Sequence, residues 1–282
     1  MRSTTAFENS ERNHVLMGFM PLINKELGEL LRPRSLLIQL LGWTLFLNGF
    51  LLVTLLVPRE FVDRPELEPA ERAELMEFIS GPETPVMVFF LITGMAMAIA
   101  AVVTLQDAII QEKQTGTAAW ILSKPVTRLS FIMSKLGGHL FRLVFIIVLP
   151  QTLLAFVQLR LIGEFDINLA SYLMALPMLL LFVLSFSTLT LMLGTWFESR
   201  AYIIGIPFFL IIAYQPLTMM LSPINDALPY KLVMMSTDSG TTLITQAILG
   251  QPLDTMMPLL FASLYVSLFT ITAVLRFQHQ EL

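Results

Sequence analysis

Six apolar stretches of about twenty residues each dominate the sequence and limit what it can fold into. A helix needs about 20 apolar residues to cross about 30 Å of hydrocarbon, and lipid offers its backbone no other hydrogen-bond partners. We therefore expect an all-α polytopic membrane protein with six transmembrane helices. These helices are expected at residues 35–57, 86–105, 139–159, 171–195, 201–221 and 258–275.

Charged residues are scarce, at 13% of the chain, against about 25% in a soluble domain. The only ionisable side chains inside the six stretches are His139 and Arg142, which lie in the first turn of the third stretch. The stretches contain no Asp, Glu or Lys, which carry the coupled ion in many secondary transporters. If the protein is a transporter, its driving energy must enter from outside the membrane.

Sequence signatures of catalysis are also absent. There is no cysteine, no GxxxxGK[ST] nucleotide loop, no HExxH and no GxSxG pattern. We therefore expect no enzyme active site, cofactor, metal or nucleic-acid partner in this chain. Three methionine pairs near the outer loops leave a Cu(I) path open, because thioethers bind soft metals, but flexible apolar packing explains them as well. They are Met219 with Met220, Met234 with Met235, and Met256 with Met257.

The distribution of Lys and Arg predicts which way the helices cross. When the loops are assigned alternately to two sides, the side with the N-terminus receives twelve of these residues and the other side receives five. Such an excess marks the cytoplasmic side. We therefore place both termini in the cytoplasm, with residues 1–34 as a cytoplasmic N-terminal part and residues 35–282 as the transmembrane domain. The expected location is the plasma membrane, which is the inner membrane in a bacterium.

Residues 21–35, with the sequence PLINKELGELLRPRS, predict an amphipathic helix before the first span. Apolar side chains recur at helical spacing at Leu22, Ile23, Leu27, Leu30 and Leu31, and the opposite face holds Asn24, Lys25, Glu26, Glu29 and Arg32. This pattern indicates a helix that lies in the cytoplasmic interface of the membrane and that Pro33 ends. The alternative is a cytosolic extension of the first span.

Two longer loops are expected on the outer side. Residues 58–85 hold eight carboxylates and three arginines, and their centre at 68–79 could form a short acidic helix. Residues 222–257 carry two apolar stretches, 228–235 and 243–249, which could dip into the membrane as a plug or lid. Loops of this length are usually structured or functional, so either one is a candidate site for an extracytoplasmic partner.

A charged, turn-rich segment separates the second and third spans: QEKQTGTAAWILSKPVTRLSFIMSKL, residues 111–136. The second span should continue to Glu112, after which Gly116 permits a sharp turn and Thr115 or Thr117 can cap a short helix over 117–123. Pro125 suits the first position of the helix that follows. The product is a short helix held crosswise beneath the membrane, between two long helices.

The short helix carries Trp120, Ile121 and Leu122, which are too apolar to face water. A helix of this length cannot bury them by itself. We expect them to lie in the headgroup layer or in a cleft on a soluble partner.

This segment resembles the corresponding part of the ABC-2 family of ABC transporter membrane subunits. The resemblance rests on the pattern Glu112-(x)3-Gly116-Thr117, on Leu122-Ser123-x-Pro125, and on the Arg128 and Lys135 that follow. The Lys25-Glu26…Arg32 helix, the short turn at 194–197 and the six-span layout are similar too. The resemblance covers most of the chain, and its specific part is residues 112–135.

The resemblance implies a permease, in most members an exporter, that dimerises with a second copy or with a related permease. It also implies two cytoplasmic ATPase subunits, which bind ATP and Mg²⁺, and a coupling helix near 117–123 that fits a groove in the ATPase. Trp120 and Leu122 would be the buried contacts and Glu112 would brace the turn. The implied coupling residues are Glu112, Thr115, Gly116, Thr117, Trp120, Ile121, Leu122, Pro125 and Arg128, together with Lys25, Glu26, Glu29 and Arg32 on the interfacial helix.

Two other classes of function are open. A membrane scaffold could dock soluble proteins without transport of its own, whereas a membrane-embedded enzyme is disfavoured by the missing motifs. The lack of charge in the spans favours an apolar or amphipathic cargo. Polar side chains in the spans could still line a path, or could bond one helix to another. They are Thr44, Asn48, Gln151, Thr152, Ser185, Ser187, Thr188 and Thr190.

Overall fold

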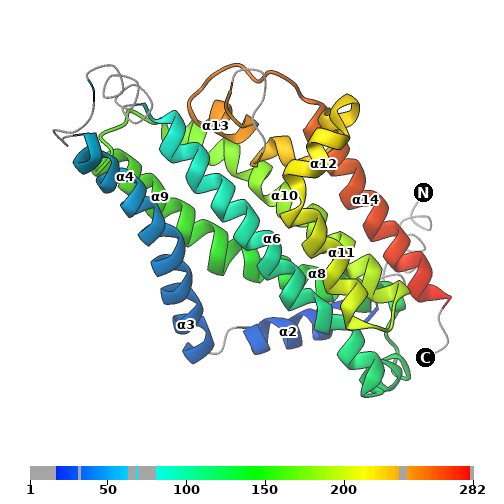
Figure 1. Cartoon of the computed structure of the whole chain (residues 1–282). Coiled ribbons are helices and arrows are strands. Elements are labelled where there is room, and N and C mark those ends of the chain that lie inside the picture. The colour runs from blue at the N-terminus through cyan, green and yellow to red at the C-terminus, as the bar shows by residue number, and fades with distance from the viewer. Residues whose placement is uncertain (1–16, 31–32, 63–67, 69–80, 235–239, 280–282) are drawn as a thin grey trace, which may run out of the picture.

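The computed structural model describes residues 17–30, 33–62, 68, 81–234 and 240–279. These residues form helices and no strands, which confirms the prediction of an all-α protein. In this part of the chain, five helices are long and apolar enough to cross a membrane, and a bent pair of shorter helices would make a sixth. The protein is thus a helical polytopic membrane protein whose long helices lie side by side in one bundle (Figure 1).

The long helices follow the order of the expected spans. The first and third are each interrupted by a short π-helical segment, and the fifth is the bent pair. The first consists of α3 (Pro33–Trp43), η1 (Thr44–Asn48) and α4 (Gly49–Val62), and the second is α6 (Glu83–Gln114). The third consists of α8 (Arg128–Arg142), η2 (Leu143–Val148) and α9 (Leu149–Leu161). The others are α10 (Leu169–Trp196), the pair α11 (Arg200–Ile212) and α12 (Tyr214–Met220), and α14 (Met257–Gln278).

The third long helix differs most from its expected bounds. It runs over Arg128–Leu161, or 34 residues, and not from residue 139. Pro125 precedes it and does not open it, because Thr127 provides the cap: its hydroxyl accepts a hydrogen bond from the backbone N–H of Ser130 at 3.1 Å. The first half of this helix is amphipathic and packs on other parts of the protein. Its sequence therefore lacks the continuous apolar run by which a membrane span is predicted.

The fifth long helix is broken and is not one straight span over 201–221. The axes of α11 and α12 meet at 70°. Pro216 explains the break, because a proline removes the hydrogen bond to the residue four positions earlier, which is Ile212, and its ring collides with that carbonyl group. Pro177 and Pro207, in contrast, lie within α10 and α11 as the sequence predicts.

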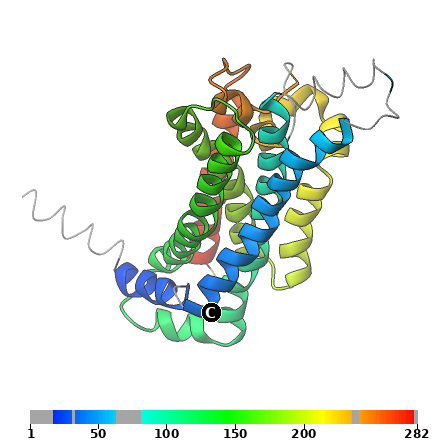
Figure 2. The same cartoon turned by 90° about the vertical axis from the view of Figure 1, so that its left-hand side faces the viewer.

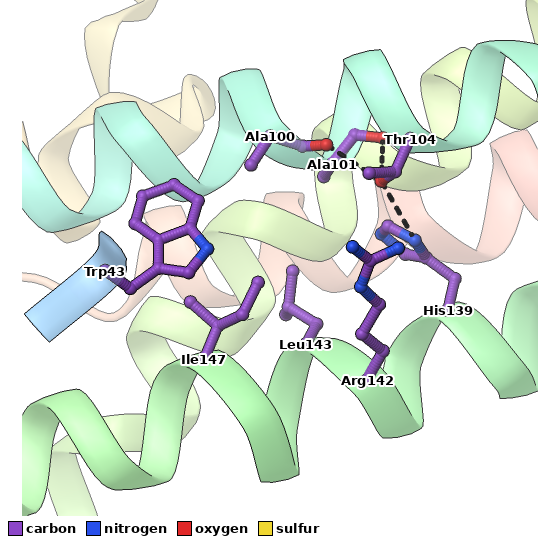
Figure 3. Close-up of a pocket in the computed structure, with 8 residues that line it drawn as sticks. All are labelled: Trp43, Ala100, Ala101, Thr104, His139, Arg142, Leu143 and Ile147. Atoms are coloured by element: carbon purple, nitrogen blue, oxygen red, sulfur yellow. Dashed lines mark hydrogen bonds between the residues drawn. The ribbon is translucent and has the colours of Figure 1, made fainter. Parts of the chain in front are cut away.

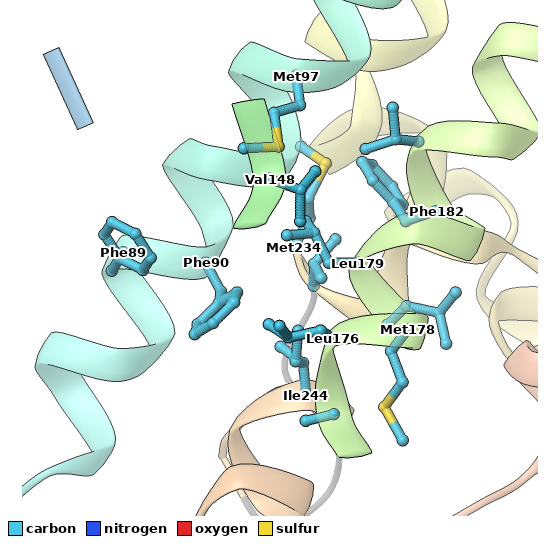
Figure 4. Packing of buried hydrophobic residues seen from close by; sticks show 14 of the residues in the cluster. Phe89, Phe90, Met97, Val148, Leu176, Met178, Leu179, Phe182, Met234 and Ile244 are labelled. Carbon is cyan, nitrogen blue, oxygen red and sulfur yellow. The ribbon is translucent and has the colours of Figure 1, made fainter. Parts of the chain in front are cut away.

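Helix α10 forms the centre of the bundle. Of its apolar window, 72% is buried, against 17% for the first long helix and 17% for α14. Phe182 and Leu179 of α10 pack with Phe90 and Met97 of α6, and Ile244 of α13 joins the same cluster (Figure 4). The first long helix and α14 therefore leave broad apolar faces outside the core.

The polar side chains in the spans bond mainly to the backbone. Ser185, Ser187, Thr188 and Thr190 donate to carbonyl groups of their own helix, α10. Thr152 donates within its own helix as well, to the carbonyl of Val148. These bonds are typical of helix packing, where a hydroxyl in an apolar setting is satisfied locally.

One polar pair joins two different long helices. The side-chain amide of Asn48, at the end of η1, donates to the side-chain oxygen of Gln151 in α9 at 2.7 Å, and both residues are buried. The other amide atoms, Oδ1 of Asn48 and Nε2 of Gln151, have no hydrogen-bond partner among the described residues. The sequence named both residues as candidates for bonding between helices, and the structure brings them together in that role.

The described part of the segment 222–257 forms η3 (Ser222–Ala227), η4 (Pro229–Leu232) and α13 (Leu243–Ile248). Leu243, Ile244 and Ile248 of α13 are buried against the bundle, near α10 and α6. Tyr230 is also buried, and its hydroxyl donates to the carbonyl of Leu210 at 2.9 Å. Burial raises the pKa of Tyr230 to about 12. The two apolar stretches thus cap one end of this chain's own core, while the acidic helix expected at 68–79 lies outside the described residues apart from Glu68.

Helix α2 (Phe19–Leu30) lies crosswise to the long helices at the opposite end of the bundle (Figures 1 and 2). It packs on α8 through its apolar side, where Leu22 joins a cluster around Phe131 and Phe277. The expected helix reached residue 35, but Pro33 begins α3 and does not simply end α2. Proline suits this position because the first turn of a helix needs no N–H donor there.

Candidate functional site

The segment between α6 and α8 contains one short helix, α7 (Thr117–Leu122). Gly116 precedes it with φ +71°, in the left-handed region that side chains other than glycine rarely adopt. The carbonyl of Gly116 then accepts a hydrogen bond from the backbone N–H of Trp120 at 3.1 Å. The sequence therefore placed both the turn and the short helix correctly, at the end where α2 also lies.

Trp120 extends from α7 into open space. Its side chain is 61% exposed, and the Nζ atom of Lys124 lies 3.5 Å from the centre of its ring. A lysine over an aromatic face contributes a cation–π attraction, which is modest at an exposed site. Because so large an apolar side chain is exposed on a charged surface, α7 presents a contact that no described part of this chain covers.

Ile121 points the other way. It is 6% exposed and packs with Leu105 of α6 and with Phe131 and Ile132 of α8. The sequence allowed only the headgroup layer or a soluble partner for this residue, and that was wrong. The turn at Gly116 folds α7 back beneath the bundle, so that Ile121 fastens the short helix to both of its long neighbours. Leu122 is half-buried in the same cluster.

A group of four charged side chains ties α2, α6 and α8 together. The Nζ atom of Lys135 donates to Oε1 of Glu112 at 2.6 Å and to Oε1 of Glu26 at 2.7 Å. Lys25 lies 3.6 Å from the same oxygen of Glu112. The Lys135 side chain is only 8% exposed, so its charge depends on these two carboxylates. We call Lys25, Glu26, Glu112 and Lys135 the ion cluster.

The ion cluster changes the roles expected for two residues. Glu112 was expected to brace the turn after α6, but its carboxylate pairs with Lys135 and Lys25 on other helices. Glu26 was assigned to the polar face of α2, and the structure shows that its carboxylate binds Lys135 of α8. The signal in the sequence is the spacing of Arg128, Phe131, Ile132 and Lys135, which places them on one face of a helix.

Arg128, the first residue of α8, binds the end of α14. Its Nη1 atom donates to the carbonyl groups of Phe277 at 2.9 Å and Gln278 at 2.7 Å. The last carbonyls of a helix have no partner within the helix and carry partial negative charge, so a guanidinium group satisfies both needs. Arg128 thus connects the short-helix region to the last helix of the bundle.

The remaining predicted site residues are less involved. The hydroxyls of Thr115 and Thr117 lie 2.8 Å apart at the turn, and Pro125 is exposed between α7 and α8. Glu29 belongs to α2, but its side chain lies outside the described part of the structure, as does all of Arg32. The structure therefore brings together the turn, α7 and the ion cluster, and it leaves Trp120 as the exposed element.

Comparison with known proteins gives a family but no activity. No curated protein matches the sequence. The sequence model described as "Protein of unknown function (DUF2705)" matches residues 46–282. The match includes α7 and the long helices from the middle of the first one onward, but it leaves out α2 and α3. The chain therefore belongs to the family DUF2705.

Proposed function

We propose that this chain is the membrane-spanning permease subunit of an ABC-2 type transporter, and that it couples to a separate cytoplasmic ATPase subunit through residues 111–136. The observation that carries the proposal is the exposure of Trp120 on a short helix fixed between two long helices. An energy-coupling contact needs an accessible apolar anchor and a rigid connection to the helices that move. Large aromatic residues are the most frequent anchors at protein interfaces.

The rigid connection consists of three parts. Ile121 holds α7 against α6 and α8, the ion cluster joins α6 and α8 to α2, and Arg128 joins the start of α8 to the end of α14. A push on Trp120 would therefore act on several helices at once and would not simply bend one loop. The ATPase would bind ATP and Mg²⁺, and this chain would contribute no catalytic group.

The membrane topology follows the same proposal, with six spans and both termini in the cytoplasm. Met17 accepts a hydrogen bond from the backbone N–H of Thr127 at 3.1 Å, and Phe277 accepts one from Arg128. The described ends of the chain therefore lie at the same end of the bundle, which supports an even number of crossings with the bent pair α11–α12 as the sixth. Side chains of α2 such as Lys25 would then face the cytoplasmic interface of the plasma membrane.

The assembly would contain two permeases and two ATPase subunits and would act as an exporter. The first long helix and α14 are each buried over only 17% of their apolar window. Their free faces offer room both for lipid and for a second permease. The apolar stretches hold few charged side chains, which supports an apolar or amphipathic cargo.

Co-purification with an ATPase subunit encoded beside this chain tests the proposal. We expect Trp120→Glu to abolish co-purification or to uncouple ATP hydrolysis from transport, because it places a charge in an apolar contact. Trp196→Glu is the matched control, since Trp196 is 54% exposed at the same end of the bundle but lies on α10, beside Arg276. Equal ATPase binding and equal transport in wild type and Trp120→Glu would contradict the proposal.

The scaffold alternative predicts a different result. A docking protein would bind its soluble partner through Trp120, but the partner's ATP hydrolysis would not depend on the ion cluster. In the permease, Lys135→Met should lower transport per ATP hydrolysed even where the ATPase still binds. Reconstitution of both subunits in vesicles therefore separates the two functions.

A further inference from the structure

A small recess lies among the first three long helices, near the end of the bundle where α2 lies. Its volume is about 50 Å³, more than one water molecule requires. Trp43 closes one end, while Arg142 and His139 lie side by side at the other (Figure 3). The lining residues are Trp43, Ala100, Ala101, Thr104, His139, Arg142, Leu143 and Ile147.

The lining of the recess carries a positive charge and no negative charge. Arg142 is a permanent cation, and none of the lining residues is an acid. Its Nε atom donates to Oε1 of Gln39 at 3.0 Å, which fixes the side chain without neutralising it. A guanidinium group at the edge of the hydrocarbon region favours an anion, and phosphate oxygens match its geometry.

His139 adds an unused acceptor. The hydroxyl of Thr104 donates to the carbonyl of Ala100 at 2.8 Å, and the 3.3 Å contact between Thr104 and Nδ1 of His139 then fits the tautomer in which Nδ1 carries the hydrogen. In a neutral imidazole the other nitrogen, Nε2, is then an acceptor. This atom is buried and has no hydrogen-bond partner among the described residues. The recess therefore offers a cation for an anion and an acceptor for a hydroxyl group.

A count of residues along the third long helix places the recess near the edge of the hydrocarbon region. Arg160 marks the far end of the third long helix, and about 20 residues span the hydrocarbon region. Counting that number back from Arg160 places the near boundary at about residue 140, between His139 and Arg142. Trp43 and Gln39 lie in the first turns of the apolar window Leu36–Leu56, where tryptophan commonly marks the interface.

We propose that this recess binds the headgroup of an anionic phospholipid whose polar end carries a hydroxyl group. Arg142 would hold the phosphodiester, and Nε2 of His139 would accept a hydrogen bond from the headgroup hydroxyl. The acyl chains would remain in the bilayer, because the recess is too small to enclose them. Basic pockets between membrane helices on the cytoplasmic side bind such headgroups. The proposal does not require an ATPase to dock at α7.

The test is thermal unfolding of the purified full chain in mixed micelles that contain phosphatidylglycerol, phosphatidylmethanol or phosphatidylcholine. Phosphatidylglycerol should raise the Tm most, phosphatidylmethanol less, because it lacks the hydroxyl, and phosphatidylcholine least. Inorganic phosphate should not reproduce the effect; a shift with phosphate as large as with phosphatidylglycerol would overturn the lipid assignment in favour of a soluble anion.

Arg142→Gln should weaken the apparent affinity for phosphatidylglycerol about fivefold, the usual effect of one arginine near the membrane surface. Arg34→Gln is the matched control: it removes an exposed arginine at the start of the same membrane-crossing region but outside the recess. Unchanged preference for phosphatidylglycerol in Arg142→Gln, or equal loss in both variants, would overturn the proposal.

A second variant keeps the charge and removes the space, in case Arg142→Gln does not fold. Ala100→Leu enlarges a side chain in the lining and leaves Arg142 and His139 unmutated. It should reduce the preference for phosphatidylglycerol over phosphatidylcholine as strongly as Arg142→Gln. Retention of the full preference in a folded Ala100→Leu protein would show that lipid selection occurs elsewhere.

Discussion

Lys135 on α8 and Glu112 on α6 form a hydrogen-bonded ion pair, with 2.6 Å between Nζ and Oε1. Both side chains are largely buried, at 8% and 13% exposure. They lie on either side of α7, so the pair closes the base of the short-helix segment. Glu26 of α2 shares the same lysine, so Lys135 links its own helix, α8, to two others.

Lys135→Met should destabilise the protein strongly. It leaves Glu26 and Glu112 facing each other without their shared cation, and removal of one partner from a buried ion pair costs about 3–5 kcal/mol. Lys25→Met is the control, because Lys25 is 43% exposed and lies 3.6 Å from Glu112, where an ion pair contributes about 0–1 kcal/mol. Thermal unfolding in detergent compares the two, and equal Tm losses would show that the buried pair is not what holds α2, α6 and α8 together.

Asn48 and Gln151 should show coupled effects on stability. Each single change to Leu leaves the other amide buried without its bond, whereas the double change removes both polar groups. In membrane helices such side-chain pairs couple by about 0.6 kcal/mol on average and about 1.7 kcal/mol at most. A double-mutant cycle measures the coupling. Thr54→Val serves as a reference, because Thr54 bonds only within its own helix, to the carbonyl of Leu51; additive effects of Asn48→Leu and Gln151→Leu would contradict the pairing.

Arg128→Met should loosen the last turn of α14. The carbonyls of Phe277 and Gln278 lose their cationic donor, and such an interaction at a helix end contributes about 0.3–1 kcal/mol. Hydrogen exchange of the amides in this turn should become about two- to fivefold faster. Arg276→Gln, in the same turn but directed at the ring of Trp196, should change these rates less. Unchanged exchange in Arg128→Met would show that the end of α14 does not depend on α8.

Gly116→Ala should disturb α7 through backbone strain alone. The glycine has φ +71°, and an added Cβ would meet no atom within 4 Å, so the cost is conformational and amounts to about 1–2 kcal/mol. Faster tryptic cleavage at Lys113 and Arg128, which flank the helix, would report the change. Gly28→Ala is the matched control, since Gly28 lies within α2 with equally open space around it, and alanine there should favour the helix. Cleavage at the wild-type rate in Gly116→Ala would show that the left-handed turn is not needed.

The approximate places and the order of the long helices followed from the apolar runs alone, because a run of about 20 apolar residues has few alternatives to crossing a bilayer. The turn at Gly116 and the short helix after it were also readable, since glycine and proline restrict the backbone locally. The amphipathic character of α2 followed from its periodicity. These features depend on residues that are near one another in the chain.

Only the tertiary structure decided which faces met. The pairing of Lys135 with Glu26 and Glu112, and that of Asn48 with Gln151, joins residues about a hundred positions apart or on separate helices. The third long helix begins at Arg128 because its amphipathic start packs on α2, and Ile121 is buried because α7 folds back on α8. Local sequence patterns determine where a helix forms and which of its sides is apolar. The rotation of each helix and its contacts depend on the packing of all its neighbours, and no single segment of the chain encodes this packing.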